Sequence, residues 1–261
     1  MHPKAIELKG APSGSGRFPA ICAPLVGRTR EQLLAEVAVV AAKQPDILEW
    51  RVDFFEGIAD AAEVVSLAGR IKQVAGGMGV LFTRRCAREG GEKIGIAEEK
   101  VVALYRAVCE SGHVEFVDFE MGNDPAHLLA VREAARKHGV QLVLSFHDFT
   151  GTPPLELLKA RFAQAQALGA DIAKVAAMPA NMDDVLTLLA ATLQSSRDLR
   201  IPLVSMAMGR FGAVSRLCGW AFGSAVTFAV GQSSSAPGQM PIEDVEAGVA
   251  LLQRALRRQD L

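Results

Sequence analysis

The sequence predicts an α/β protein of the (β/α)8 TIM-barrel class, and three observations support this prediction. Short apolar runs alternate with longer segments in which apolar residues recur at helical spacing. Such an alternation requires parallel strands joined by helical crossovers. Eight units can be counted in 261 residues, close to the about 250 residues typical of this barrel. An open doubly wound sheet is the alternative architecture.

The predicted strands are apolar runs bounded by turn-forming or polar residues. They span Phe18–Val26, Ile47–Phe54, Gly79–Thr83, Val114–Glu120, Gln141–Phe146, Asp171–Ala176, Pro202–Met208 and Ala225–Val230.

Several of the intervening helices have recognisable ends. Thr29 and Gln32 form a capping box before the first helix, which places Leu33, Leu34, Val37, Val40 and Ala41 on one face. Asp124-Pro125 predicts the start of the fourth helix, and Gly139 follows its end. For the fifth helix, Thr152-Pro153 and Gly169 have the same positions.

The chain contains no internal repeat and no linker-like segment that would divide it. We therefore expect one catalytic domain over residues 1–261, in which residues 1–17 form an N-terminal, hairpin-like extension to the barrel. That extension lacks the apolar core of a secretory signal, which favours a cytoplasmic location.

Composition narrows the class of partner. The 28 Lys and Arg residues nearly balance the 29 Asp and Glu residues, so we expect a small-molecule partner rather than nucleic acid or a membrane surface. The longest apolar stretch, residues 217–231, is interrupted by glycines and is too short to span a bilayer. Four scattered cysteines suit reduced thiols and predict no metal site.

Polar residues gather where the predicted strands end, which is where such barrels place their active sites. These candidates are Glu49, Arg51, Arg84, Arg85, Glu89, Asp118, Glu120, His147, Lys174, Met208 and Arg216, with Met206 inside strand seven. Taken singly, each has a structural explanation, such as a salt bridge for Glu49 with Arg51 or core packing for the methionines. Their coincidence is what favours a functional site.

Lys174 is the most informative of these residues. By strand alternation it shares a face with Ile172 and Ala176, so it points into the barrel between apolar neighbours. Apolar burial and nearby arginines disfavour its charge, and a neutral amine can attack a carbonyl carbon. With His147 at a neighbouring strand end and several arginines nearby, this predicts Schiff-base chemistry on an anionic substrate. A lysine that extends to the solvent at the barrel mouth is the structural alternative.

The segment GQSSSAPGQMP follows the eighth strand and precedes the last helix. Its composition is that of a flexible linker, but its position is that of a covering loop. As a lid, it would place Ser235 and Gln239 over a bound substrate. Motifs of P-loop, zinc-protease or serine-hydrolase chemistry do not occur in the sequence.

These pieces together closely resemble the type I 3-dehydroquinate dehydratases. The resemblance covers most of the chain and keeps the family's order and spacing. It rests on PLVGRT, EWRVD, TRRCAREGGE, VDFEM, SFHDFTGTP, DIAKVAAMP, SMAMGRFGAVSR, FGSAVTFA and SSSAPGQMPI.

The resemblance implies roles for most of these candidates and for the two residues of the covering loop. Lys174 would form an imine with the ring ketone of 3-dehydroquinate, His147 would act as general acid and base, and Glu89 would orient His147. Arg216, Ser235 and Gln239 would bind the substrate carboxylate. Glu49, Arg51 and Arg85 would bind its hydroxyls, and Met206 and Met208 would pack on its ring. The resemblance further implies a (β/α)8 barrel, no metal or organic cofactor, and a homodimer.

The sequence departs from the family pattern at three places. Arg84 adds a charge of unknown role, Phe146 stands where a tyrosine is frequent, and a serine found near residues 21–27 in some members is absent.

Two other functions stay open at this point. A Schiff-base aldolase or transaldolase would use a strand-six lysine in the same barrel, commonly with a phosphate site after strands seven and eight. A non-catalytic barrel that binds a small carboxylate would keep the arginines but would not require the lysine beside a histidine.

Overall fold

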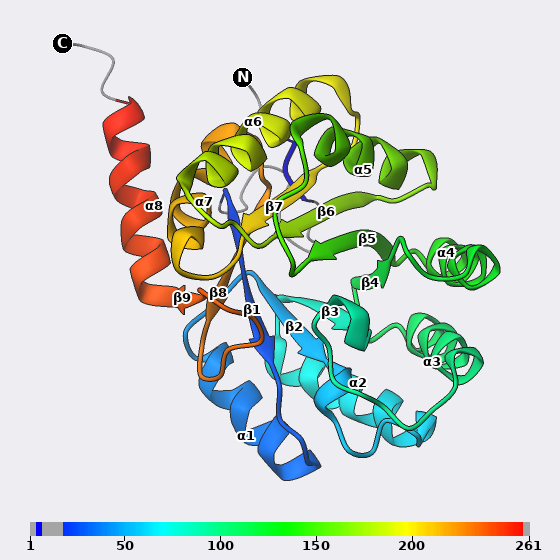
Figure 1. Cartoon of the computed structure of the whole chain (residues 1–261). Coiled ribbons are helices and arrows are strands. Elements are labelled where there is room, and N and C mark those ends of the chain that lie inside the picture. The colour runs from blue at the N-terminus through cyan, green and yellow to red at the C-terminus, as the bar shows by residue number, and fades with distance from the viewer. Residues whose placement is uncertain (1–3, 7–17, 258–261) are drawn as a thin grey trace.

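In the computed structural model, which describes residues 4–6 and 18–257, parallel strands form a curled sheet and the helices lie outside it (Figure 1). The strand order is β7-β6-β5-β4-β3-β2-β1-β8-β9. The strands are β1 (Ala20–Leu25), β2 (Ile47–Arg51), β3 (Gly79–Thr83), β4 (Phe116–Glu120), β5 (Gln141–Asp148), β6 (Ile172–Ala177), β7 (Leu203–Ala207), β8 (Val226–Val230) and β9 (Met240–Pro241).

The helices follow the strands in alternation. They are α1 (Arg30–Ala41), α2 (Ala61–Ala75), α3 (Glu98–Ser111), α4 (Pro125–His138), α5 (Leu155–Ala167), α6 (Met182–Asp198), α7 (Ala213–Cys218) and α8 (Ile242–Arg257). Four short 3-10 turns, η1 (Val52–Phe54), η2 (Ala87–Glu89), η3 (Arg210–Gly212) and η4 (Gly219–Phe222), follow strand ends or α7.

The predicted barrel is confirmed, although its strand ladder is incomplete at one seam. Each strand from β1 to β6 pairs in parallel with the next one along the chain, and β8 pairs with β1. Between β7 and β8 a single bridge joins Leu203 and Ser224. This sequential order differs from that of a doubly wound sheet, whose strand order reverses at a switch point.

Strand alternation sorts the side chains into two apolar layers. Trp50 and Val52 face outward into the large core between strands and helices, as do Ala173 and Val175. Ile172 and Ala176 belong to the inner cluster, together with Ile47, Leu81, Phe116, Val143, Val204, Met206 and Phe228. The inward direction predicted for residue 174 therefore follows from its neighbours on β6.

Two of the predicted helix starts are confirmed and one is wrong. Thr29 and Gln32 form the capping box of α1, and Asp124 caps the start of α4. Gly139 follows the last residue of α4 as a C-cap in the left-handed conformation. The fifth helix does not begin at Thr152-Pro153. Its first residue is Leu155, and Pro154 occupies the cap position without a side-chain hydrogen bond.

Two of the differences between predicted and observed strand bounds concern residues near the site. β2 ends at Arg51 because the chain turns into η1, so Asp53 does not lie on the strand. β5 continues to Asp148, which makes His147 part of the strand. The two-residue β9, which pairs with β8, was not predicted.

The hairpin predicted for residues 1–17 lies outside the described residues, apart from residues 4–6, which have no regular structure. Within the described part of the chain, no helix combines the length and apolarity needed to cross a membrane.

Candidate active site

A cavity opens at the carboxyl ends of the strands, and of the residues to which the resemblance gives a role, all except Arg216 line it. Glu49 and Arg51 come from β2, His147 from β5, Lys174 from β6 and Met206 from β7. Loop residues Arg85, Glu89, Met208, Ser235 and Gln239 complete the predicted set, and Gly90, Phe149, Ala176, Phe228 and Ala236 fill the remaining wall.

Lys174 points into this cavity from an apolar wall, as predicted, but a carboxylate adjoins it. Its Nζ lies 4.6 Å from the centre of the Phe228 ring and 2.9 Å from Asp118 Oδ2. Glu49 Oε1 lies 3.9 Å away. The amine was expected to be uncharged because the prediction rested on apolar neighbours and arginines alone. The structure also places the negative charge of Asp118 beside it.

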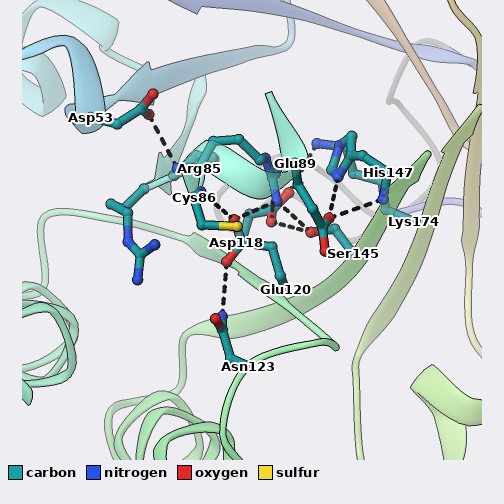
Figure 2. A network of polar contacts seen from close by, with 12 residues as sticks. Asp53, Arg85, Cys86, Glu89, Asp118, Glu120, Asn123, Ser145, His147 and Lys174 are labelled. Carbon is teal, nitrogen blue, oxygen red and sulfur yellow. Dashed lines mark hydrogen bonds and ion pairs between the residues drawn. The ribbon is translucent and has the colours of Figure 1, made fainter. Parts of the chain in front are cut away.

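Asp118 belongs to a buried network that joins β4, β5, β6 and the loop after β3 (Figure 2). Its Oδ1 accepts a hydrogen bond from Ser145 Oγ at 2.6 Å and forms an ion pair with Arg85 Nη2 at 2.7 Å. Arg85 Nη1 donates to Glu120 Oε1 at 3.1 Å and to Ser145 Oγ at 2.7 Å. Burial alone would raise the pKa of the Asp118 carboxyl, but the charges of Arg85 and Lys174 outweigh it and hold the pKa well below its usual range.

The carboxylates of this network accept hydrogen bonds from cations and from neutral backbone and side-chain donors. Glu120 also accepts hydrogen bonds from the Cys86 N–H and from Asn123 Nδ2, each at 2.8 Å (Figure 2). Burial opposes the charge of Arg85, yet Asp118 and Glu120 raise the pKa of that guanidinium above its usual value. Among residues 4–6 and 18–257, no three His, Cys, Asp or Glu side chains gather as a metal site requires.

Glu89 holds His147 by two contacts to one carboxylate oxygen. Oε2 lies 2.9 Å from His147 Nδ1 and accepts the His147 backbone N–H at 2.9 Å. Burial lowers the pKa of His147 well below 6.5, and the charges of Arg85 and Lys174 act in the same direction. Burial also raises the pKa of Glu89 to about 7, where the charge of Arg85 opposes the rise and that of Glu120 adds to it.

The loop after β8 covers the cavity and is tied to the barrel. Arg51 Nη1 donates to the Ser235 carbonyl at 3.3 Å. Gln239 Oε1 accepts the Ser235 N–H at 2.9 Å, which fixes the two residues relative to each other. The Gly209 N–H donates to the Pro237 carbonyl at 3.2 Å. Ser235 and Gln239 are thereby brought to the cavity, as the sequence predicted.

Arg216 is fully buried behind this loop rather than along the cavity wall. Its guanidinium donates to two backbone carbonyls, Phe228 at 3.1 Å and Pro237 at 3.2 Å. No carboxylate in the described part of the chain pairs with it, and burial lowers its pKa to about 10. A buried cation without a counter-ion is costly, so this position favours an anion brought by a ligand.

A family model described as type I 3-dehydroquinase matches residues 21–255, nearly the whole chain. The chain belongs to the type I 3-dehydroquinase family. This membership confirms the resemblance stated from the motifs.

Proteins named as 3-dehydroquinate dehydratases match nearly the whole chain. The 3-dehydroquinate dehydratase of Albidiferax ferrireducens is 55% identical over 97% of this chain and 96% of that protein. That of Aromatoleum aromaticum is 50% identical over 97% and 98%. The crystal structure of 3-dehydroquinate dehydratase from Geobacillus kaustophilus superposes with a TM-score of 0.92 at 48% identity and covers 97% of both chains.

Asp53 and Ser145 were not predicted as site residues, and Asp118 and Glu120 were noted at the end of their strand without a role. The signal for the last two was available, because residues 118 and 120 share the inward face of one strand. Arg84, whose role was unknown, points outward and pairs with Glu98 at the start of α3. Phe146 also faces outward, where the Arg161 guanidinium lies 4.6 Å from its ring centre.

The raised pKa of Glu89 predicts a pH-dependent stability difference between the wild type and Glu89→Gln. The unfolded carboxyl loses its proton near 4.5 and the native one at about 7, so stability from the protonated form is present below 4.5 and is lost as the pH rises to about 7. Over that window the wild type should lose roughly 3 kcal/mol relative to the variant. Urea unfolding at several pH values measures this difference, and parallel curves would contradict the assignment.

Proposed function

We propose that this chain converts 3-dehydroquinate to 3-dehydroshikimate and water through an imine on Lys174, in aromatic amino-acid biosynthesis. The observation that carries the proposal is a single cavity that contains a buried lysine and a histidine held by a carboxylate. Membership of the type I 3-dehydroquinase family supports the choice of substrate.

The proposed reaction begins at the Lys174 amine. His147 takes a proton from the Lys174 ammonium, and the neutral amine attacks the ring ketone. The imidazolium then returns this proton to the hydroxyl of the adduct, which leaves as water and gives a protonated imine. This imine withdraws electrons from the adjacent carbon and makes its C–H bond acidic enough for an imidazole to remove the proton. Hydrolysis of the product imine consumes the water lost earlier, so the net change is loss of one water from the substrate.

In this proposal His147 moves the protons and Glu89 orients it. The lowered pKa of His147 keeps its ring neutral and ready to accept the proton from carbon. The imidazolium then protonates the departing hydroxyl, which leaves as water. The contact between Nδ1 and Glu89 directs the ring, so that its other nitrogen is available to the substrate.

We assign the substrate carboxylate to Arg216, Ser235 and Gln239. The support is electrostatic, because Arg216 is the buried arginine of this region that lacks a carboxylate partner among the described residues. A guanidinium offers a carboxylate two parallel hydrogen bonds. Ser235 and Gln239 would add neutral donors from the covering loop, which already contacts Arg216 through Pro237.

The remaining cavity residues are assigned to the ring and its hydroxyls. Glu49, Arg51 and Arg85 present polar atoms to the cavity from β2 and the loop after β3, and Met206 and Met208 present apolar surface from the β7 side. The aldolase and the non-catalytic alternatives have no comparable support, because the chain's full-length relatives are named as dehydratases.

Borohydride trapping tests the proposed chemistry. Incubation with 3-dehydroquinate followed by borohydride should attach the reduced ring to Lys174, because reduction turns the imine into a stable secondary amine. Lys174→Ala should abolish both the label and turnover, whereas Lys100→Ala, on the exposed surface of α3, should retain both. Peptide mass mapping locates the label, and a label elsewhere or normal turnover in Lys174→Ala would refute the proposal.

Arg216→Lys tests the carboxylate assignment. A lysine keeps the charge but cannot form two parallel hydrogen bonds, so KM for 3-dehydroquinate should rise about tenfold or more while kcat changes less. Arg210→Lys is a matched control, because Arg210 is exposed and stacks on Phe211 outside the cavity. Steady-state kinetics measure both variants; an unchanged KM in Arg216→Lys would exclude the assignment.

We also propose that the chain acts as a homodimer in the cytoplasm. The resemblance to the family supports the dimer, and four free cysteines support a reducing compartment. Light scattering coupled to size exclusion should give twice the 27.8 kDa chain mass, and a monomer mass would refute the dimer.

A further inference from the structure

Asp53 lies outside the cavity wall, yet it is bonded to the residues that build the wall. It is in η1, immediately after β2, and its side chain has 0% exposure. Each carboxylate oxygen accepts two hydrogen bonds. Oδ1 accepts from Arg51 Nε at 2.9 Å and from the Arg85 N–H at 3.1 Å, and Oδ2 accepts from Arg51 Nη2 at 2.8 Å and from the Glu92 N–H at 3.0 Å.

The first pair of bonds fixes the Arg51 guanidinium. A carboxylate that accepts from both Nε and Nη2 holds the guanidinium in one plane. The Phe54 ring, with its centre 5.0 Å from Arg51 Cζ, supports the same group. Only Nη1 is then directed away from Asp53, and it donates to the Ser235 carbonyl of the covering loop. Asp53 therefore sets how Arg51 enters the cavity and how it meets the loop.

The second pair of bonds fixes the loop after β3 at both of its ends. Arg85 and Glu92 bracket the segment that contains Glu89 and Gly90, both of which line the cavity. Glu89 in turn holds His147. The segment is tight, since a Cβ on Gly91 would come within 1.9 Å of the Arg85 carbonyl oxygen. One carboxylate thus aligns an arginine of β2 with the loop that orients the histidine.

We propose that Asp53 is a positioning residue for the reaction, which acts through Arg51 and through the backbone of residues 85–92. The inference rests on the proposed function, because it assigns Asp53 to the same cavity. Asp53 touches neither the cavity nor a reacting atom, so it is not a catalytic residue. Its carboxylate is the only group among the described residues that bonds to Arg51 and to both ends of this loop.

Asp53→Asn tests the proposal, because the amide keeps the shape but replaces one acceptor oxygen with a donor that opposes the facing N–H groups. Loss of hydrogen bonds to a charged group predicts a rise in KM of about tenfold or more. Asp53→Glu keeps the charge on a longer side chain and should also raise KM. It is the alternative test if the amide variant does not fold. An unchanged KM in the folded variants overturns the proposal.

Asp46→Asn is the matched control, because Asp46 sits at the other end of β2 and accepts the Ile21 N–H at 2.7 Å. It removes a comparable carboxylate–backbone contact, so it should lower thermal stability without changing KM. An equal rise in KM in Asp46→Asn would mean that loss of either carboxylate destabilises the barrel in general. That result would overturn the proposal.

A double-mutant cycle with Arg51→Gln separates positioning from a structural role. If Asp53 acts through Arg51, Asp53→Asn should change KM far less in the Arg51→Gln background than in the wild type. Fully additive effects contradict the proposal.

Calorimetric titration of the same variants with 3-dehydroshikimate gives a readout that needs no turnover. If the wild type binds 3-dehydroshikimate but does not convert 3-dehydroquinate, the proposed function is refuted. The cycle calculated from the calorimetric dissociation constants then still decides the role of Asp53.

Discussion

Pairing between buried charges is the constraint on which the rest of this site depends. Asp118, Arg85 and Lys174 are each nearly inaccessible to solvent, and removal of any one charge would leave its partners buried and uncompensated. Asp118 contacts both cations, and Ser145 bonds to Asp118 and to Arg85. Because a buried charge tolerates few arrangements, the network fixes where the Lys174 amine and the Arg85 guanidinium can lie.

The barrel supplies the register that makes this pairing possible. Glu120, Ser145 and Lys174 are opposite one another on β4, β5 and β6, and Thr83 is opposite Asp118 on β3 and β4. Their side chains share the inner face, so they form rows at the carboxyl end above the inner apolar cluster. The apolar layer excludes water from below, which strengthens the electrostatic interactions in the rows.

Strand alternation allowed the inward direction of Lys174 and the shared face of Glu49 and Arg51 to be predicted from the sequence. Alternation says which face a side chain occupies but not which residue on the next strand lies opposite, since register depends on pairing. For that reason the contact between Asp118 and Lys174 was not predicted although both residues were noted. Asp53 was missed because η1 ends the strand early, and no local pattern in the sequence marked that turn.

The cations of the site fall into two groups. The protein supplies a counter-ion to the first group, whereas the second has none among the described residues. Arg51 has Asp53, Arg85 has Asp118 and Glu120, and Lys174 has Asp118, so their positions are set before any ligand arrives. Arg216 has only carbonyl partners among the described residues, and burial lowers its pKa. A ligand carboxylate gains most where a positive charge is not already neutralised. If Arg216 binds the substrate carboxylate as proposed, this division explains how several buried cations can lie in one region while the negative charge of the substrate is directed to one of them.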